Sequence, residues 1–174
     1  MSDDQSFICQ TCGERHAGLP MDFGFRLPDE VHSLGYLDRY LRSRSNADFC
    51  ALDEARYYVR GVLPLPVQSS EDEFCWGVWV EIAQAHHDRY LAGFEEEAPD
   101  LFTFAGKIAN DVPGYGGTIG LAVEVRLRKA GERPAVYVTD SSHALSHEQR
   151  AGISHKRHHD ILEATGFFEK KDDA

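Results

Sequence analysis

Apolar and polar residues alternate most clearly between residues 74 and 82. The even-numbered positions of this stretch are all apolar, whereas its odd-numbered positions are mixed. Because successive side chains of a strand point to opposite faces, the stretch predicts a strand with one buried face. Similar alternation, or a run of aromatic and β-branched residues, predicts four further strands. They are expected at residues 56–63, 101–109, 121–128 and 135–138.

The acidic pair Asp29 and Glu30 opens a stretch with apolar residues at helical spacing, which predicts a helix. The apolar positions that should pack against the domain are Val31, Leu34, Leu37 and Leu41. A short helix is expected around residues 86–94, and a long closing helix from about Ser146 to Phe167. Strands joined by tight turns, with helices toward the two ends, predict an α+β fold in which an antiparallel sheet carries helices on one side.

The length and charge of the chain narrow its class. At 174 residues it can form one domain, placed at 1–169, with 1–26 as an N-terminal metal-binding segment and 170–174 as a frayed tail. A net charge of −11, from 18 basic and 29 acidic residues, opposes binding to nucleic acid. The chain has no apolar stretch that could span a membrane, so a membrane partner is not expected. Four cysteines without an N-terminal signal pattern indicate a cytoplasmic protein.

The N-terminal segment contains the motif Cys9-Gln-Thr-Cys12-Gly13-Glu-Arg-His16. A C-x2-C turn allows two thiolates to bind one ion at tetrahedral angles, and a glycine after the second cysteine suits such a turn. Zinc is therefore the leading hypothesis for Cys9 and Cys12. The alternatives are thiol–disulfide exchange, which usually uses a motif that opens a helix, and two ordinary reduced thiols.

A tetrahedral zinc site needs four ligands, and Cys9, Cys12, His16 and the remote Cys50 form the most economical set. With four protein ligands the site would be closed, so the zinc would be structural. The alternative for Cys50 is a small buried thiol, and the alternative for His16 is a surface histidine. Cys75 lies inside the strand expected at residues 74–82 and is assigned to packing.

Other groups of polar residues give weaker signals. Among five C-terminal histidines, His155 and His159 are four residues apart, but the glutamate of a metalloprotease motif is missing between them, so we expect a solvent-facing helix. The glycines between residues 114 and 120 have no phosphate-binding motif beside them, and a mobile loop is expected there. The sequence shows no nucleophile motif and identifies no catalytic residue.

Six short motifs occur together along the chain. They are Cys9-x2-Cys12-Gly13-x2-His16, Leu19-Pro20-x-Asp22-x-Gly24-Phe25-x2-Pro28-Asp29, Cys50-x-Leu52-Asp53, Tyr58-Val59-Arg60-Gly61, Trp76-Gly77-Val78-Trp79-Val80 and Gln149-Arg150-x-Gly152-Ile153. With them the chain resembles a bacterial family catalogued as domain of unknown function 2199. The resemblance implies a small, single-domain cytoplasmic protein without an assigned activity. It also implies that Cys9, Cys12 and Cys50 match family cysteines, which supports Cys50 as a ligand, whereas Cys75 departs from the pattern.

Two functional hypotheses follow. The first is a non-enzymatic, zinc-stabilised protein that binds another protein or a second copy of itself as a homodimer, with the strand at Trp76–Ile82 and neighbouring loops as its surface. The second is a small-molecule-binding protein or enzyme with a pocket between the sheet and the loop at residues 111–120. Its candidate lining residues are Glu81, Trp79, Arg60 and Asp111. A deep cleft that gathers them would favour the second hypothesis, and a flat exposed apolar patch the first.

Overall fold

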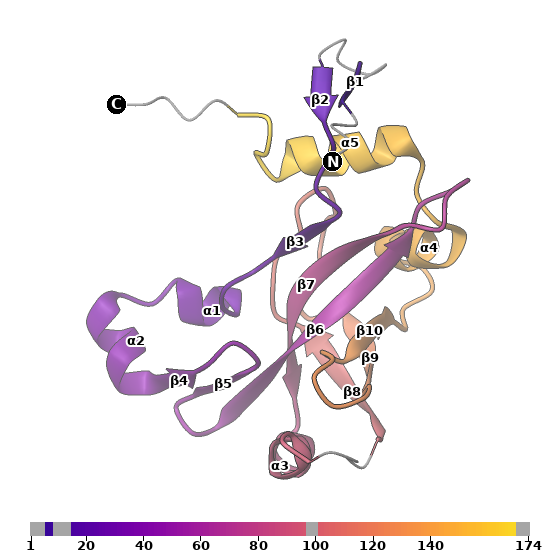
Figure 1. The fold of residues 1–174 in the computed structure, drawn as a ribbon. Coiled ribbons are helices and arrows are strands. Elements are labelled where there is room, and N and C mark those ends of the chain that lie inside the picture. The colour runs from indigo at the N-terminus through magenta and orange to yellow at the C-terminus, as the bar shows by residue number, and fades with distance from the viewer. Residues whose placement is uncertain (1–5, 9–14, 97–100, 170–174) are drawn as a thin grey trace.

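The computed structural model of the protein describes residues 6–8, 15–96 and 101–169. Figure 1 shows a central group of strands with helix α5 at the top, α4 at the right, α3 at the bottom, and α1 and α2 at the left. The strands are β1 (Ser6–Ile8), β2 (Arg15–Ala17), β3 (Asp22–Gly24), β4 (Ser43–Ser45), β5 (Phe49–Leu52), β6 (Arg56–Pro66), β7 (Glu73–Ile82), β8 (Thr103–Ile108), β9 (Ala122–Arg126) and β10 (Ala135–Val138). The helices are α1 (Asp29–His32), α2 (Tyr36–Arg42), α3 (Gln84–Gly93), α4 (Ala144–Ala151) and α5 (His155–Ala164).

Strands β6 to β10 close into a five-stranded barrel, because β10 pairs back onto β6. That closing pair is parallel, whereas the other barrel pairs are antiparallel. Strand β3 extends the sheet beyond β7 in parallel, and β5 and β4 extend it beyond β6. The α+β class is therefore confirmed. The prediction of a purely antiparallel sheet was wrong, because the sheet closes on itself and contains two parallel strand pairs.

The length of β6 allows this closure. The strand pairs with β5 through Arg56 to Val59, with β7 from Tyr57 to Pro66, and with β10 at Val62. A Cβ atom at Gly61 would lie 2.4 Å from the Val136 side chain, so glycine permits the close approach of β10.

The main core fills the barrel, and its pattern confirms the alternation in β7. The five even-numbered residues from Phe74 to Ile82 are at most 6% exposed. Trp79, on the opposite face of β7, is also buried, in a second cluster beneath α1 with Val31, Cys50, Leu52 and Tyr58. On that second face Cys75, Gly77 and Glu81 are only half-buried, and β7 is paired with β3, β6 and β8. The expectation that β7 and its neighbouring loops form an interaction surface stays a prediction.

The helix expected from residue 29 is interrupted between His32 and Tyr36. Gly35 has an extended backbone and begins α2 as a separate helix. Val31 of α1 is buried as expected, but Leu37 and Leu41 of α2 are 64% and 69% exposed. The break turns α2 away from the domain, so its apolar face does not pack as the helical spacing predicted.

The closing helix expected between Ser146 and Phe167 is also two helices. Gly152 has a φ of 84°, a conformation that ends α4 and that side chains other than glycine rarely adopt. Ile153 then forms a bridge with Val67, and the Ser154 hydroxyl accepts a hydrogen bond from the Arg157 backbone amide at the start of α5. The interruption moves α5 onto a different part of the barrel from α4.

Candidate functional site

The predicted zinc ligands are only partly within the described residues. Cys9 and Cys12 lie outside them. His16 lies in β2, opposite Phe7 of β1, but its side chain is likewise outside the description. Pro20 lies further along the same segment, and its carbonyl oxygen is 2.8 Å from Nε2 of His158 on α5. Burial lowers the pKa of this histidine. A neutral His158 that donates this hydrogen bond holds the chain after β2 against α5.

Cys50 lies in a different part of the molecule. Its side chain is 1% exposed in the cluster beneath α1, and burial raises the pKa of its thiol to about 11. Figure 1 places β5, which carries Cys50, well away from the β1–β2 pair that carries His16. This position favours the packing interpretation of Cys50 over the ligand interpretation. Cys75 is half-buried on β7, which agrees with its assignment to packing.

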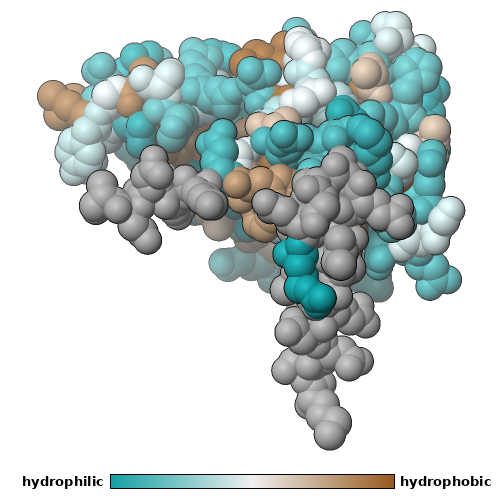
Figure 2. Space-filling model, turned by 90° about the horizontal axis from the view of Figure 1, so that it is seen from above, coloured by the Kyte–Doolittle hydropathy of each residue, from teal (hydrophilic) through white to brown (hydrophobic). Residues whose placement is uncertain are grey.

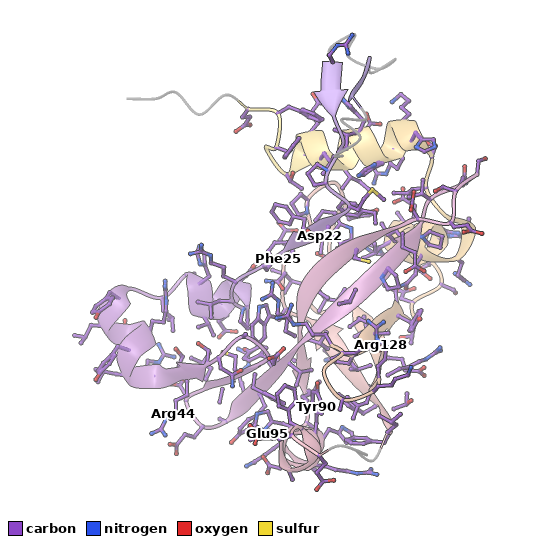
Figure 3. The ribbon with its side chains drawn as sticks, viewed as in Figure 1. Asp22, Phe25, Arg44, Tyr90, Glu95 and Arg128 are labelled. Atoms are coloured by element: carbon purple, nitrogen blue, oxygen red, sulfur yellow. The ribbon has the colours of Figure 1, made fainter. Side chains whose placement is uncertain are left out.

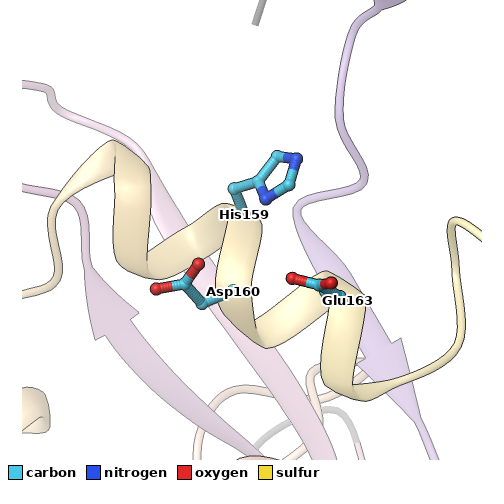
Figure 4. Close-up of side chains that lie close together, drawn as sticks. All are labelled: His159, Asp160 and Glu163. Carbon is cyan, nitrogen blue, oxygen red and sulfur yellow. The ribbon is translucent and has the colours of Figure 1, made fainter. Parts of the chain in front are cut away.

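Helix α5 brings three potential ligands close together. Donor atoms of His159, Asp160 and Glu163 all lie within 4.8 Å of one another (Figure 4). Asp160 already accepts a salt bridge from Lys156 at 2.9 Å, and the His159 ring stacks on Phe168. The expectation of a solvent-facing helix was wrong for this face, because His159 is only 5% exposed.

The residues proposed to line a pocket beside the 111–120 loop are not gathered in one cavity. Glu81 does line a cavity of about 450 Å³ together with Ile119 and Gly120 of that loop. Trp79 is instead buried beneath α1, and the Asp111 backbone amide donates to the Asp29 carboxylate.

Arg56 pairs with acidic side chains that line this cavity. Its guanidinium donates two hydrogen bonds to Glu81, at 2.9 and 2.7 Å, and one to Glu30. This pairing lowers the pKa of Glu81, although burial opposes the shift. Glu81 is therefore held as a paired anion, which makes it a poor general base. Arg56, which also pairs with Glu30, links the sheet to α1.

Asn110 fixes α1 and the loop to the sheet. Its side-chain oxygen accepts from the Trp79 backbone amide at 2.7 Å, and its amide nitrogen donates to the Leu27 carbonyl and the Asp29 carboxylate. Asn110 is fully buried, so these bonds replace water that the side chain cannot reach. They set the position of α1, and hence the position from which α2 projects.

Helix α2 carries four large apolar side chains on one exposed side. We call this the α2 apolar surface. Its members, with their exposed fractions, are Tyr36 (87%), Leu37 (64%), Tyr40 (75%) and Leu41 (69%). They are spaced one and four residues apart, which places them on neighbouring positions of a helix. A helix on the surface of a folded domain usually packs its large apolar residues against the core, whereas α2 exposes them to solvent.

Polar side chains hold α2 to the rest of the protein. Arg39 donates to the carbonyl oxygens of His32 and Leu34, at 2.7 and 3.0 Å. Arg42 makes a two-pronged pair with Asp53, at 2.8 and 2.7 Å, in the turn between β5 and β6. These contacts anchor the polar side of the helix and leave the α2 apolar surface facing solvent.

The sequence of the chain matches one family of known proteins. The profile of a family described as "Uncharacterized protein conserved in bacteria (DUF2199)" matches residues 8–153. The chain belongs to this family. The match confirms the resemblance drawn from the motifs, and the family description gives no activity to this DUF2199 protein. Neither a curated protein nor a solved structure matches the chain significantly.

Sequence reasoning missed the α2 apolar surface in this DUF2199 protein. The signal was the repeated Tyr-Leu pair at residues 36–37 and 40–41, preceded by Gly35. Figure 2 shows hydrophobic residues at the left-hand edge of the molecule, the side on which α2 lies in Figure 1. Among the described residues, the structure has no helix long and apolar enough to cross a membrane.

Proposed function

We propose that this DUF2199 protein is a binding module that docks on another protein through the α2 apolar surface. A second copy of the chain is the simplest partner, because two such surfaces can cover each other. The observation that carries the proposal is the exposure of four large apolar side chains on one short helix. Contiguous exposed apolar patches on folded domains mark interaction sites.

The chemistry of the surface supports a protein partner. Tyrosine and leucine side chains supply apolar area, and the tyrosine hydroxyls can also find polar partners at an interface. Burial of a leucine side chain contributes about 1.5–3 kcal/mol relative to leaving it in water. The anchoring by Arg39 and Arg42 means that α2 is held in place before a partner arrives, which reduces the entropy lost on association.

Replacement of both α2 leucines, in the variant Leu37→Glu, Leu41→Glu, is expected to abolish self-association. Sedimentation equilibrium over a range of protein concentrations measures the mass. The wild type should shift toward a dimer as concentration rises, and the variant should remain a monomer because the charges would be buried in the interface. The melting temperature should change little, since both leucines are exposed.

Leu91→Glu is the matched control, because Leu91 is a 48% exposed leucine on α3, outside the α2 apolar surface. The control should associate like the wild type. A wild type that stays monomeric at every concentration would remove the homodimer version of the proposal. Equal loss of association in the control and the α2 variant would show that exposed leucines act without regard to position.

We further infer that the N-terminal segment binds a structural zinc ion through Cys9, Cys12 and His16. The spacing of these residues supports the inference, as does the His158 contact that holds the adjoining chain on α5. The four-ligand set expected from the sequence also includes Cys50. The position of Cys50 beneath α1 favours a different residue as the fourth ligand.

Elemental analysis of purified, untagged protein tests this set of ligands. The wild type should contain one equivalent of zinc, and Cys12→Ser should lose it because a hydroxyl is a poor zinc ligand. Cys50→Ser is the matched control and should keep the zinc, although its buried hydroxyl should lower the melting temperature. Loss of zinc in both variants would restore Cys50 to the ligand set, and a metal-free wild type would overturn the zinc proposal.

A further inference from the structure

Arg60 lies across three strands of the outer sheet face. It belongs to β6, opposite Trp79 of β7, and its guanidinium reaches the backbone of Gly24 on β3 and Gly77 on β7. A Cβ atom at Gly24 would lie 2.6 Å from Arg60 Nη2, and one at Gly77 would lie 3.6 Å from it. The two glycines therefore form a flat floor on which the guanidinium rests.

The guanidinium of Arg60 lacks the partners that a half-buried charge normally has. Throughout the described part of the chain, it forms no salt bridge, and its buried Nε–H has no hydrogen-bond acceptor. The nearby Asp48 carboxylate is already paired with Arg133, at 3.0 Å. Burial, reinforced by the positive charge of Arg133, lowers the pKa of Arg60, and Asp48 only partly opposes this shift.

This arrangement is unusual on energetic grounds. Leaving a buried donor without an acceptor costs about 1–3 kcal/mol, and more when the group is charged. The protein has a net charge of −11, so acidic residues are abundant, yet none of the described acidic residues pairs with Arg60. The two terminal N–H groups of a planar guanidinium match the two oxygens of a carboxylate or phosphate group.

We propose that Arg60, resting on the Gly24 and Gly77 floor, binds a small oxyanion, either a carboxylate or a phosphate. Gly24 is exposed on the edge strand β3, so an anion can approach the guanidinium from solvent. The two terminal N–H groups, which are not among the buried donors, would donate to two oxygens of the anion. Arg133 adds positive charge nearby without supplying a second contact.

Nuclear magnetic resonance of the arginine Nε–H groups tests the site in the full chain. Wild-type protein is titrated separately with sodium phosphate and sodium acetate, and sodium chloride keeps the ionic strength constant. The Arg60 resonance, assigned from its absence in Arg60→Lys, should shift to saturation with at least one anion. Saturation by phosphate alone would identify a phosphate site, and saturation by acetate alone would identify a carboxylate site.

Two further variants separate binding from folding. Gly24→Ala places a methyl group where the guanidinium lies, while its backbone needs no left-handed conformation, so the variant should fold and bind about tenfold more weakly. Arg44→Lys is the control, because Arg44 is an exposed arginine on β4, far from Phe25 and the adjoining β3 (Figure 3). It should bind like the wild type.

Linear, unsaturated shifts of all arginine resonances with both anions would overturn the proposal, because they indicate general screening. Unchanged affinity in Gly24→Ala would also overturn it. The outcome is independent of the α2 proposal, because Arg60 lies outside α2 and its variants should leave the sedimentation mass unchanged.

Discussion

Trp76→Ala is expected to lower the free energy of unfolding by about 3–5 kcal/mol, the usual cost of deleting a large buried aromatic side chain. Trp76 is fully buried on the barrel side of β7. Its ring meets those of Phe23, Phe74 and Tyr115 edge-on, with centroids 5.7, 5.2 and 6.4 Å away. The substitution would leave a cavity at the place where β3, β7 and the 111–120 loop meet.

Urea denaturation followed by circular dichroism measures this loss without relying on tryptophan fluorescence. Tyr40→Ala is the control, because Tyr40 is 75% exposed on α2 and its removal should change stability by about 0.5 kcal/mol or less. A similar small loss in Trp76→Ala would contradict the barrel core described above. A large loss in Tyr40→Ala would show that α2 packs against the domain instead of facing solvent.

Asn110→Ala is expected to cost about 3 kcal/mol, because three hydrogen bonds of about 1 kcal/mol each are lost inside the protein. The Trp79 amide and the Leu27 carbonyl would be left without their side-chain partner. The same denaturation experiment applies. Asn46→Ala is the control, since the Asn46 side chain accepts two backbone hydrogen bonds, from Asp48 and Phe49, in an exposed turn.

The loss in Asn46→Ala should be about 1 kcal/mol, because water can replace the exposed side chain. Equal losses in the two asparagine variants would contradict the role of Asn110 as a buried clamp. The clamp also bears on function, because it fixes α1. A displaced α1 would change the direction in which the α2 apolar surface projects, and should weaken self-association in the same variant.

Local patterns along the chain predicted much of the secondary structure. The alternation in β7 correctly gave a buried face, because a period of two is set by the strand backbone itself. The closing parallel pair of β10 and β6 could not be predicted in this way. It joins Ala135 to Val62, residues far apart in the sequence, and depends on the close approach permitted at Gly61.

The candidate site was less predictable than the strands. Leu37 and Leu41 have the spacing of a core-facing helix, and that spacing is the same whether a helix face meets its own domain or a partner. The deciding contacts are the polar anchors of Arg39 and Arg42, which lie on the opposite side of α2. Their partners are 5 to 11 residues away along the chain, but the pairing depends on the break at Gly35 and on the turn after β5, which the helical spacing does not reveal. Arg60 was identified as a candidate from its sequence position, but its missing partner is visible only in the fold.

Hydrogen–deuterium exchange of the wild-type protein, compared at low and high protein concentration, tests the central claim most directly. Amides of residues 36–42 should exchange more slowly at high concentration, because association covers the α2 apolar surface, while the amides of α3 should be unaffected. Protection confined to another surface, or no concentration dependence in residues 36–42, would contradict self-association through α2.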